Sequence, residues 1–235
     1  MREKHDIELS ADEQVSTIHL RSDSDRWIFL CHGFADTKER SMLPLAEKLN
    51  EKGFNTVVFD FRGNGESSRE FSESNLSTRT EDLNSVIDHF DPENIIVYGT
   101  SFGAKTGFHT VAERNDVDLL ITKAPVTYNK IMDKFRKVIE KEGEAEFYGK
   151  TFDKRFYEDL DKYSFQEVVE NIDIPVAIFH GAEDTTVHPE NSFKAAQELE
   201  PDVMLQKFSG EKHSFSDNAT KKMVEKVVDW IESEL

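Results

Sequence analysis

The sequence predicts an α/β protein, with a mostly parallel, doubly wound sheet and a small inserted cap. Short continuous apolar runs recur along the chain, and each is followed by a polar or glycine-containing turn: residues 27–31, 56–61, 94–98, 118–121 and 175–179. Segments with helical apolar spacing lie between several of these runs: residues 43–52, 78–90 and 101–114. Continuous apolar runs indicate strands that are covered on both faces. Their alternation with helices indicates parallel strands joined by right-handed crossovers.

The remaining elements of the sheet lie at the two ends of the chain. Residues 7–20 alternate loosely between apolar and polar side chains, which predicts one or two antiparallel edge strands. Gly53 is expected to cap the C-terminus of the helix at 43–52. Residues 203–208 predict a last strand, and 218–235 predict a closing helix whose apolar residues recur every three or four positions.

Residues 126–174 interrupt the alternation of strands and helices. They contain one helix-like stretch, 130–142, followed by a stretch rich in aromatic residues. We therefore predict a core made of residues 1–125 and 175–235, with residues 126–174 inserted as a cap. Any one of these aromatic residues is explained if it anchors the cap to the core. Together they are candidates for lining a substrate pocket, and Tyr128, Phe147 and Tyr148 are among the candidates.

Length and composition narrow the class of protein. A chain of 235 residues, 37% of them apolar, is enough for one packed domain. No stretch is long and apolar enough for a membrane helix, and the N-terminus is charged, so we expect a cytoplasmic protein without a membrane partner. The single cysteine, Cys31, excludes an internal disulfide and cysteine-based zinc patterns. Neither a metal nor an organic cofactor is expected.

The charge of the chain bears on its partners. A formal net charge of -18 repels phosphate backbones, so a nucleic-acid partner is not expected. An excess of acidic residues is also typical of proteins adapted to concentrated salt. Extreme halophiles tend to lose lysine, however, and lysine outnumbers arginine here. Salt adaptation and an ordinary acidic surface both stay open, as does a homodimer.

The predicted strand at 94–98 runs directly into Gly99-Thr100-Ser101-Phe102-Gly103, a G-x-S-x-G sequence that precedes a predicted helix. A sharp strand-to-helix turn would expose the Ser101 hydroxyl, and small residues beside it allow the turn to pack against neighbouring backbone. The helix N-terminus supplies free N–H groups, so the amide of Phe102 can stabilise an oxyanion. Ser101 is therefore the predicted nucleophile, and a glycine-lined structural turn is the alternative.

Three further motifs of the sequence resemble those of the α/β-hydrolase superfamily of serine hydrolases, in the same order: H-G-F at 32–34, D-x-R-G-x-G-x-S at 60–67 and H-G-x-x-D at 180–184. The resemblance covers nearly the whole chain and implies an α/β-hydrolase fold, with the amide of Phe34 as the second oxyanion donor. The small cap and residues 211–217 are similar to bacterial carboxylesterases that include cinnamoyl and feruloyl esterases. Those enzymes often have a histidine where this chain has Thr100.

The order of the triad in that superfamily, serine then acid then histidine, implies the other catalytic residues. His213 lies between the last predicted strand and the last helix, which makes it the expected general base. Asp184 follows the predicted strand at 175–179 and is the expected acid, with Glu183 as the nearest rival. His32 and His180 each precede a glycine at a strand end, where they are expected to brace loops.

These residues predict a serine carboxylesterase that acts on small-molecule esters through an acyl-enzyme on Ser101, with aromatic or short acyl groups as the expected substrates. A thioesterase, a monoacylglycerol lipase and a ligand-binding protein with little turnover are the alternatives. The glycines of residues 62–67 do not fit dinucleotide binding, because Ser68 stands where the third glycine belongs. Cys31 lies inside an apolar strand, where a thiolate would be poorly solvated.

Overall fold

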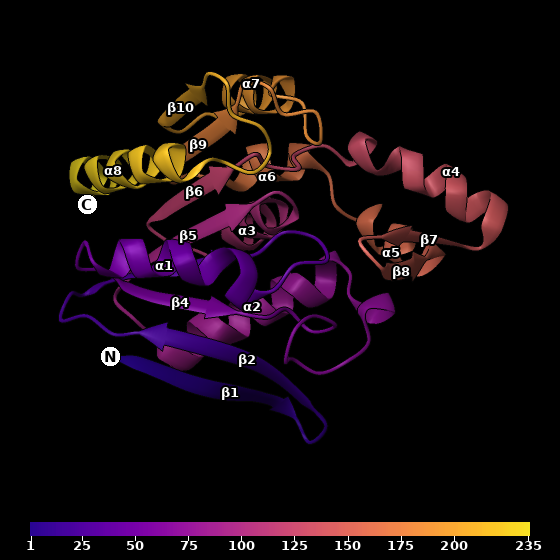
Figure 1. Ribbon diagram of the computed structural model, residues 1–235, viewed down its shortest axis with the longest axis horizontal. Helices are drawn as coiled ribbons and strands as arrows, with labels where there is room; N and C mark the ends of the chain where they lie inside the picture. Colours follow the sequence, from indigo (N-terminus) through magenta and orange to yellow (C-terminus); the bar gives the residue numbers. More distant parts are fainter.

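One eight-stranded sheet forms the centre of the computed structural model, which describes residues 1–235 (Figure 1). Its strand order is β1-β2-β4-β3-β5-β6-β9-β10. The strands from β4 to β10 are parallel, whereas β2 is antiparallel to both of its neighbours. The predicted α/β class, mostly parallel sheet and edge strands are therefore confirmed. The strands are β1 Arg2–Ser10, β2 Glu13–Leu20, β3 Arg26–Cys31, β4 Asn55–Phe59, β5 Asn94–Thr100, β6 Leu119–Lys123, β9 Val176–Gly181 and β10 Val203–Phe208.

Helices cover both faces of the sheet. On one face lie α1 (Leu43–Asn50) and α8 (Asp217–Glu234); on the other lie α2 (Leu76–Phe90), α3 (Phe102–Glu113), α6 (Phe165–Asn171) and α7 (Glu190–Glu198). Strand β3 shows why its apolar run is continuous. Ile28 and Leu30 pack in the cluster with α1 and α8, whereas Phe29 and Cys31 pack in the cluster with α2 and α3. All four side chains are fully buried, as expected when alternate residues of one strand face two helical layers.

The segment predicted as a cap forms several short elements: a 3₁₀ turn at Asn129–Met132, α4 (Asp133–Glu142), strands β7 (Glu144–Phe147) and β8 (Lys150–Asp153), and α5 (Lys154–Leu160). Figure 1 shows α4, α5 and the β7–β8 hairpin beyond the ends toward which the parallel strands point. The next helix, α6, packs on the body instead, with Phe165 edge-on to Phe108 of α3 at 5.3 Å between ring centroids. The boundary of the cap as a domain stays a prediction.

Some local details differ from the sequence prediction. A five-residue π-helix, Lys38–Met42, precedes α1, and a 3₁₀ turn, Phe71–Glu73, precedes α2. Helix α1 ends at Asn50 with Glu51 as its C-cap, so Gly53 is not the cap residue. Gly53 lies two residues further on, with φ of +99° in the turn that leads to β4. None of the helices combines the length and the apolar character needed to cross a membrane.

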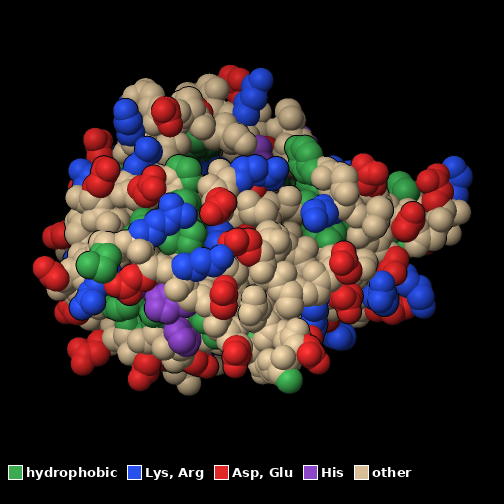
Figure 2. Space-filling view, turned by 60° about the horizontal axis from the view of Figure 1, so that its bottom comes forward, with side chains coloured by type: hydrophobic (Ala, Val, Ile, Leu, Met, Phe, Trp, Pro, Cys, Tyr) green, Lys and Arg blue, Asp and Glu red, His purple; other side chains and the backbone are tan.

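Acidic and basic side chains are mixed over the face shown in Figure 2, and they do not separate into regions of one sign. This mixing is compatible with the large negative net charge, because acidic residues outnumber basic ones by 47 to 29 along the chain. That face therefore offers no extended basic surface to a polyanion.

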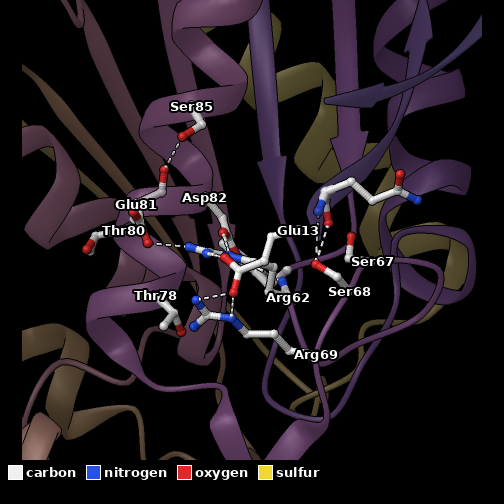
Figure 3. A network of polar contacts seen from close by, with 12 residues as sticks. Glu13, Arg62, Ser67, Ser68, Arg69, Thr78, Thr80, Glu81, Asp82 and Ser85 are labelled. Carbon is white, nitrogen blue, oxygen red and sulfur yellow. Dashed lines mark hydrogen bonds and ion pairs between the residues drawn. The ribbon is translucent and has the colours of Figure 1, made fainter. Parts of the chain in front are cut away.

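The turn after β4 is held by ion pairs that centre on Arg62 (Figure 3). The buried Arg62 guanidinium pairs with Asp82 of α2 at 2.5 Å, with Glu81 of the same helix and with Glu13 at the start of β2. Glu13 also accepts from Arg69 further along the turn. The arginine side chains of this glycine-containing turn are thus paired with carboxylates of the protein, as expected for a structural role.

Candidate active site

Ser101 lies on the turn between β5 and α3 in strained backbone geometry, with φ of 56° and ψ of -118°. Positive φ is uncommon for residues with a side chain, and it persists where surrounding contacts enforce it. Here the Ser101 N–H donates to the carbonyl of Lys123 at 2.9 Å, and the Ser101 carbonyl accepts from the N–H of Val126 at 3.0 Å. The two bonds fix the turn to the end of β6 and the loop that follows it.

The glycines on either side of Ser101 are required by close backbone contacts. A Cβ atom on Gly99 would lie 2.5 Å from the Cα of Ala104, and one on Gly103 would lie 2.3 Å from the carbonyl oxygen of Cys31. Both distances are far inside van der Waals contact. The sharp turn at Ser101 therefore depends on both glycines, as the G-x-S-x-G pattern predicts.

Asp184 and His213 form a hydrogen-bonded pair, with 2.7 Å between Asp184 Oδ2 and His213 Nδ1. Asp184 follows β9 and is 2% exposed, and His213 lies on the loop between β10 and α8. The other oxygen of Asp184 accepts from the amides of Thr186 and Val187. Burial raises the pKa of Asp184. Hydrogen bonds from His180, from His213 and from these amides outweigh burial and hold that pKa below its usual range. Asp184 is thus an anion that orients the His213 ring.

The rival acid, Glu183, is exposed and does not take part in this pair. His180 is fully buried, and its Nε2 donates to the carbonyl of Val187 at 2.9 Å and lies 3.2 Å from Asp184 Oδ2. Its Nδ1 is 2.6 Å from the hydroxyl of Ser192. His180 therefore braces the loop that carries the acid, as the sequence predicts.

His32 is also a structural residue. It is fully buried, its Nδ1 donates to the carbonyl of Gly33 at 2.8 Å, and its Nε2 accepts from the N–H of Phe61 at 3.2 Å. Burial, with the nearby Arg79 as a second cause, holds the pKa of His32 well below its ordinary value. A neutral ring with both nitrogens occupied cannot act as the base.

The loop that carries Phe34 is held at both ends, by Arg79 at its start and by Lys38 at its end. Arg79 of α2 is buried, and its guanidinium donates to the carbonyl of His32 at 2.6 Å and stacks on the ring of Phe61. At the far end of the loop, the buried Lys38 pairs with Asp60 at 2.5 Å. These contacts hold the backbone of Gly33 and Phe34 beside the start of α3, where the amide of Phe102 is one of the free first-turn donors.

Sequence reasoning missed Lys123, at the carboxyl end of β6. Its carbonyl accepts from Ser101, as described above, and its ammonium donates to the carbonyl of His213 at 3.1 Å. The ammonium also lies 5.1 Å from the ring centroid of Phe215. One residue therefore contacts both the serine turn and the histidine loop. The only signal in the sequence is a lysine two residues after the apolar run at 118–121.

Ser101 and His213 line the same cavity, whose volume is about 210 Å³. The hydrogen bonds of this structure include the His213–Asp184 pair and do not include one between Ser101 Oγ and His213. Catalytic hydrogen bonds of this kind are often long without substrate. Half of the 18 lining residues are apolar, and Asp36, Arg40 and Lys134 add charge.

Cap residues provide much of the cavity wall. Ile131, Met132, Phe135, Phe147 and Tyr148 line it, which places two of the three aromatics predicted from the sequence at the cavity. The ring of Phe147 is tilted against that of Phe34, at 5.8 Å between centroids. Tyr148, at the tip of the β7–β8 hairpin, is 77% exposed.

Tyr128 is not part of the cavity, contrary to the expectation from the sequence. Its hydroxyl donates to Glu198 at the end of α7, at 2.6 Å, and its ring packs edge-on against Phe165. Tyr128 therefore anchors the start of the inserted segment to the body.

Comparison with known families and structures agrees with this arrangement. The model of the family described as "Prolyl oligopeptidase family" matches residues 44–235. The chain belongs to the prolyl oligopeptidase family. Among curated proteins, it is 33% identical over 102 residues to an uncharacterized 31.7 kDa protein of Escherichia coli from the traX-finO intergenic region. The matched segment covers 41% of this chain and 36% of that protein, so it spans little more than a third of the relative's length.

Solved structures similar to this member of the prolyl oligopeptidase family are α/β hydrolases. Est1E from Butyrivibrio proteoclasticus, solved with ferulic acid bound, has a TM-score of 0.87 and 20% identity over 98% of both chains. The monoacylglycerol lipase of Paleococcus ferrophilus has a TM-score of 0.77 and 18% identity, covering 94% of this chain and 99% of that one. At these identities the likeness establishes the fold, and the predicted α/β-hydrolase fold is confirmed.

Proposed function

We propose that this protein is a serine hydrolase of carboxylic esters, with Ser101 as nucleophile, His213 as general base and Asp184 as the acid that orients the histidine. The observation that carries the proposal is the 2.7 Å pair between Asp184 and His213, on the same cavity as a serine held in strained geometry. Membership of the prolyl oligopeptidase family supports a serine hydrolase.

The reaction would proceed by acyl transfer. His213 Nε2 takes the proton of Ser101 Oγ as that oxygen attacks the ester carbonyl, and Asp184 stabilises the imidazolium that forms. The amides of Phe34 and Phe102 stabilise the negative charge on the carbonyl oxygen. The imidazolium then protonates the leaving alcohol, and water hydrolyses the acyl-enzyme by the same route.

The cavity supports a preference for bulky or aromatic acyl groups. Phe34, Phe147 and Tyr148 place aromatic rings along it, and aromatic pairs with offset or edge-on geometry are worth about 0.5–1.5 kcal/mol beyond the burial of area. The ferulic acid bound to Est1E supports the same acyl class, since that fold covers nearly all of this chain.

The test is hydrolysis of a substrate panel by the wild-type chain and by Ser101→Ala. We expect a burst of p-nitrophenol from short-chain p-nitrophenyl esters, turnover of methyl ferulate, and loss of both in Ser101→Ala. A thioester and a monoacylglycerol test the alternative substrate classes, and a prolyl p-nitroanilide is included because the family is named after an oligopeptidase. Faster turnover of the anilide than of every ester would reject the ester assignment. Unchanged turnover in Ser101→Ala would reject the nucleophile.

A further inference from the structure

Glu3, His5 and His19 gather on one face of the β1–β2 hairpin. Glu3 and His5 are two positions apart in β1, so their side chains leave the same face of the strand, and Glu3 pairs directly with His19 in β2. His19 in turn pairs with Val57, the middle residue of β4, and its Nε2 is 3.0 Å from the side chain of Asn55, the first residue of that strand. The cluster therefore lies at the amino ends of the parallel strands, whereas Ser101 follows the carboxyl end of β5.

One ligand atom from each of these three side chains lies within 4.8 Å of the other two. His5 Nε2 is 3.9 Å from a carboxylate oxygen of Glu3, too far for a hydrogen bond. That nitrogen is shielded from solvent and has no hydrogen-bond partner. A buried polar atom without a partner costs free energy, and an ion bound between the three side chains would satisfy it.

The tautomer of His19 is fixed by Asn55, the first residue of β4. The Asn55 amide nitrogen donates to the carbonyl of Ser24, so its oxygen faces the other way and accepts from the Ser22 N–H. The same oxygen is 3.0 Å from His19 Nε2, which must therefore carry the proton. In the neutral ring, Nδ1 of His19 then keeps its lone pair, which a metal ion can accept. Metal-binding histidines are commonly held in this way, with the second ring nitrogen donating to an oxygen.

Aromatic rings and a third imidazole surround the cluster. The His19 ring stacks on Trp27 at 4.5 Å between centroids, and Phe90 of α2 lies edge-on to His5 at 5.1 Å. His89 of α2 is 5.6 Å from His5, centroid to centroid. Figure 2 shows histidine side chains together at the surface on one side of the molecule.

We propose that Glu3, His5 and His19 bind one divalent transition-metal ion, with Zn²⁺ as the ion that best fits two imidazoles and a carboxylate. Three protein ligands leave a fourth tetrahedral position for water, and a cavity of about 510 Å³ beside the cluster gives it access. The ion would join β1 to β2, stabilising the hairpin at the edge of the sheet. The ion would take no part in the chemistry of Ser101, because the site lies at the opposite ends of the strands.

Metal titration of the untagged, EDTA-treated full-length chain tests the site. We expect about one Zn²⁺ per chain by calorimetry, a Co²⁺ absorption spectrum typical of four-coordinate nitrogen and oxygen ligands, and a Tm that rises with Zn²⁺ concentration. Glu3→Gln and His5→Ala should each weaken Zn²⁺ binding by about tenfold or more. Both side chains lie on an edge strand and are partly exposed, and circular dichroism verifies that the variants fold.

Two single-histidine variants serve as controls. His188→Ala removes an exposed histidine outside the cluster, and His213→Ala removes the proposed catalytic base; both should bind Zn²⁺ as the wild type does. Loss of binding in His213→Ala but not in His5→Ala would place the ion at the active site and overturn the proposal. Absence of binding at millimolar Zn²⁺, or equal binding by all variants, would also overturn it and leave the cluster as a set of stacked rings.

Discussion

The Lys123 ammonium donates a hydrogen bond to the backbone carbonyl of His213, with 3.1 Å between Nζ and the oxygen. The same residue accepts from the Ser101 N–H through its own carbonyl at 2.9 Å. The distance between the serine turn and the histidine loop is thus set in part by one lysine at the end of β6. Small displacements of catalytic groups are costly, because about 1 Å of misplacement lowers a rate by about a hundredfold.

Lys123→Met should therefore lower kcat for ester hydrolysis by about tenfold, with a smaller effect on KM, because the variant loosens the His213 loop without changing the cavity wall. Kinetics on a p-nitrophenyl ester measure both constants. Lys207→Met, at an exposed lysine of β10, is the matched control and should leave both constants unchanged. An equal change in the two variants would argue against a positioning role for Lys123.

Lys123 should also contribute to the pH dependence of stability. Burial lowers its pKa to about 8 from an ordinary 10.5, so between these values the unfolded chain binds more protons than the folded one. Its contribution to the free energy of unfolding therefore becomes more favourable as the pH rises from about 8 to 10.5. Denaturant unfolding at several pH values, compared with Lys123→Met, measures this contribution, and parallel curves for the two proteins would contradict it.

Asp184→Asn should lower kcat by about 10³–10⁴-fold, because an amide at this position no longer selects the tautomer of His213 that can accept the serine proton. Glu183→Gln, at the exposed neighbouring residue, should have little effect on kcat. Steady-state rates for the two variants measure this difference. If Glu183→Gln were the more damaging substitution, the identity of the acid would have to be revised.

Phe147→Ala should raise KM for methyl ferulate more than for a p-nitrophenyl acetate substrate, since only the larger acyl group reaches the cap aromatics. Because one aromatic contact is lost, we expect KM for methyl ferulate to rise by about threefold to tenfold. Tyr128→Phe serves as the control, because that ring lies outside the cavity and its hydroxyl contacts Glu198. Equal effects of Phe147→Ala on both esters would exclude Phe147 from acyl-group selection.

Glu66 should contribute to stability in acid. Hydrogen bonds from Lys38 and then Lys4 lower the pKa of Glu66 to about 2, below its ordinary 4.5. The stability that it contributes is therefore complete above about pH 4.5 and is lost as the pH falls toward 2. Tm measured from pH 7 to pH 2 should fall less steeply in Glu66→Gln than in the wild type. Identical slopes would show that the ion pairs with Lys38 and Lys4 contribute nothing.

Most of the fold could be predicted from the sequence, because buried parallel strands leave continuous apolar runs and surface helices leave periodic ones. Helix α7 was missed for a physical reason: only Ser192 and Ala195 are buried in it, so its apolar stripe is too weak to detect. The β7–β8 hairpin was missed because its turn places Tyr148 as well as Gly149 at positive φ. Asn-Gly or Asp-Gly is the usual signal of such a turn, and Tyr-Gly is not.

The candidate site was predicted where a motif marks a strand end, as for Ser101 and Asp184. Lys123 carries no such motif, since its role depends on the packing of β6 against the loop before α8. Tyr128 illustrates the opposite case. Its position in an aromatic-rich segment suggested a pocket, whereas its contact with Glu198 depends on α7, which the sequence did not reveal.

Mass spectrometry of the protein after reaction with a fluorophosphonate tests the proposed chemistry most directly. The reagent should add once per chain, the modified peptide should locate the adduct on Ser101, and Asp184→Asn should slow the reaction strongly. Ester hydrolysis that continues while Ser101 stays unmodified, or an adduct on another residue, would contradict the assignment of Ser101 as the nucleophile.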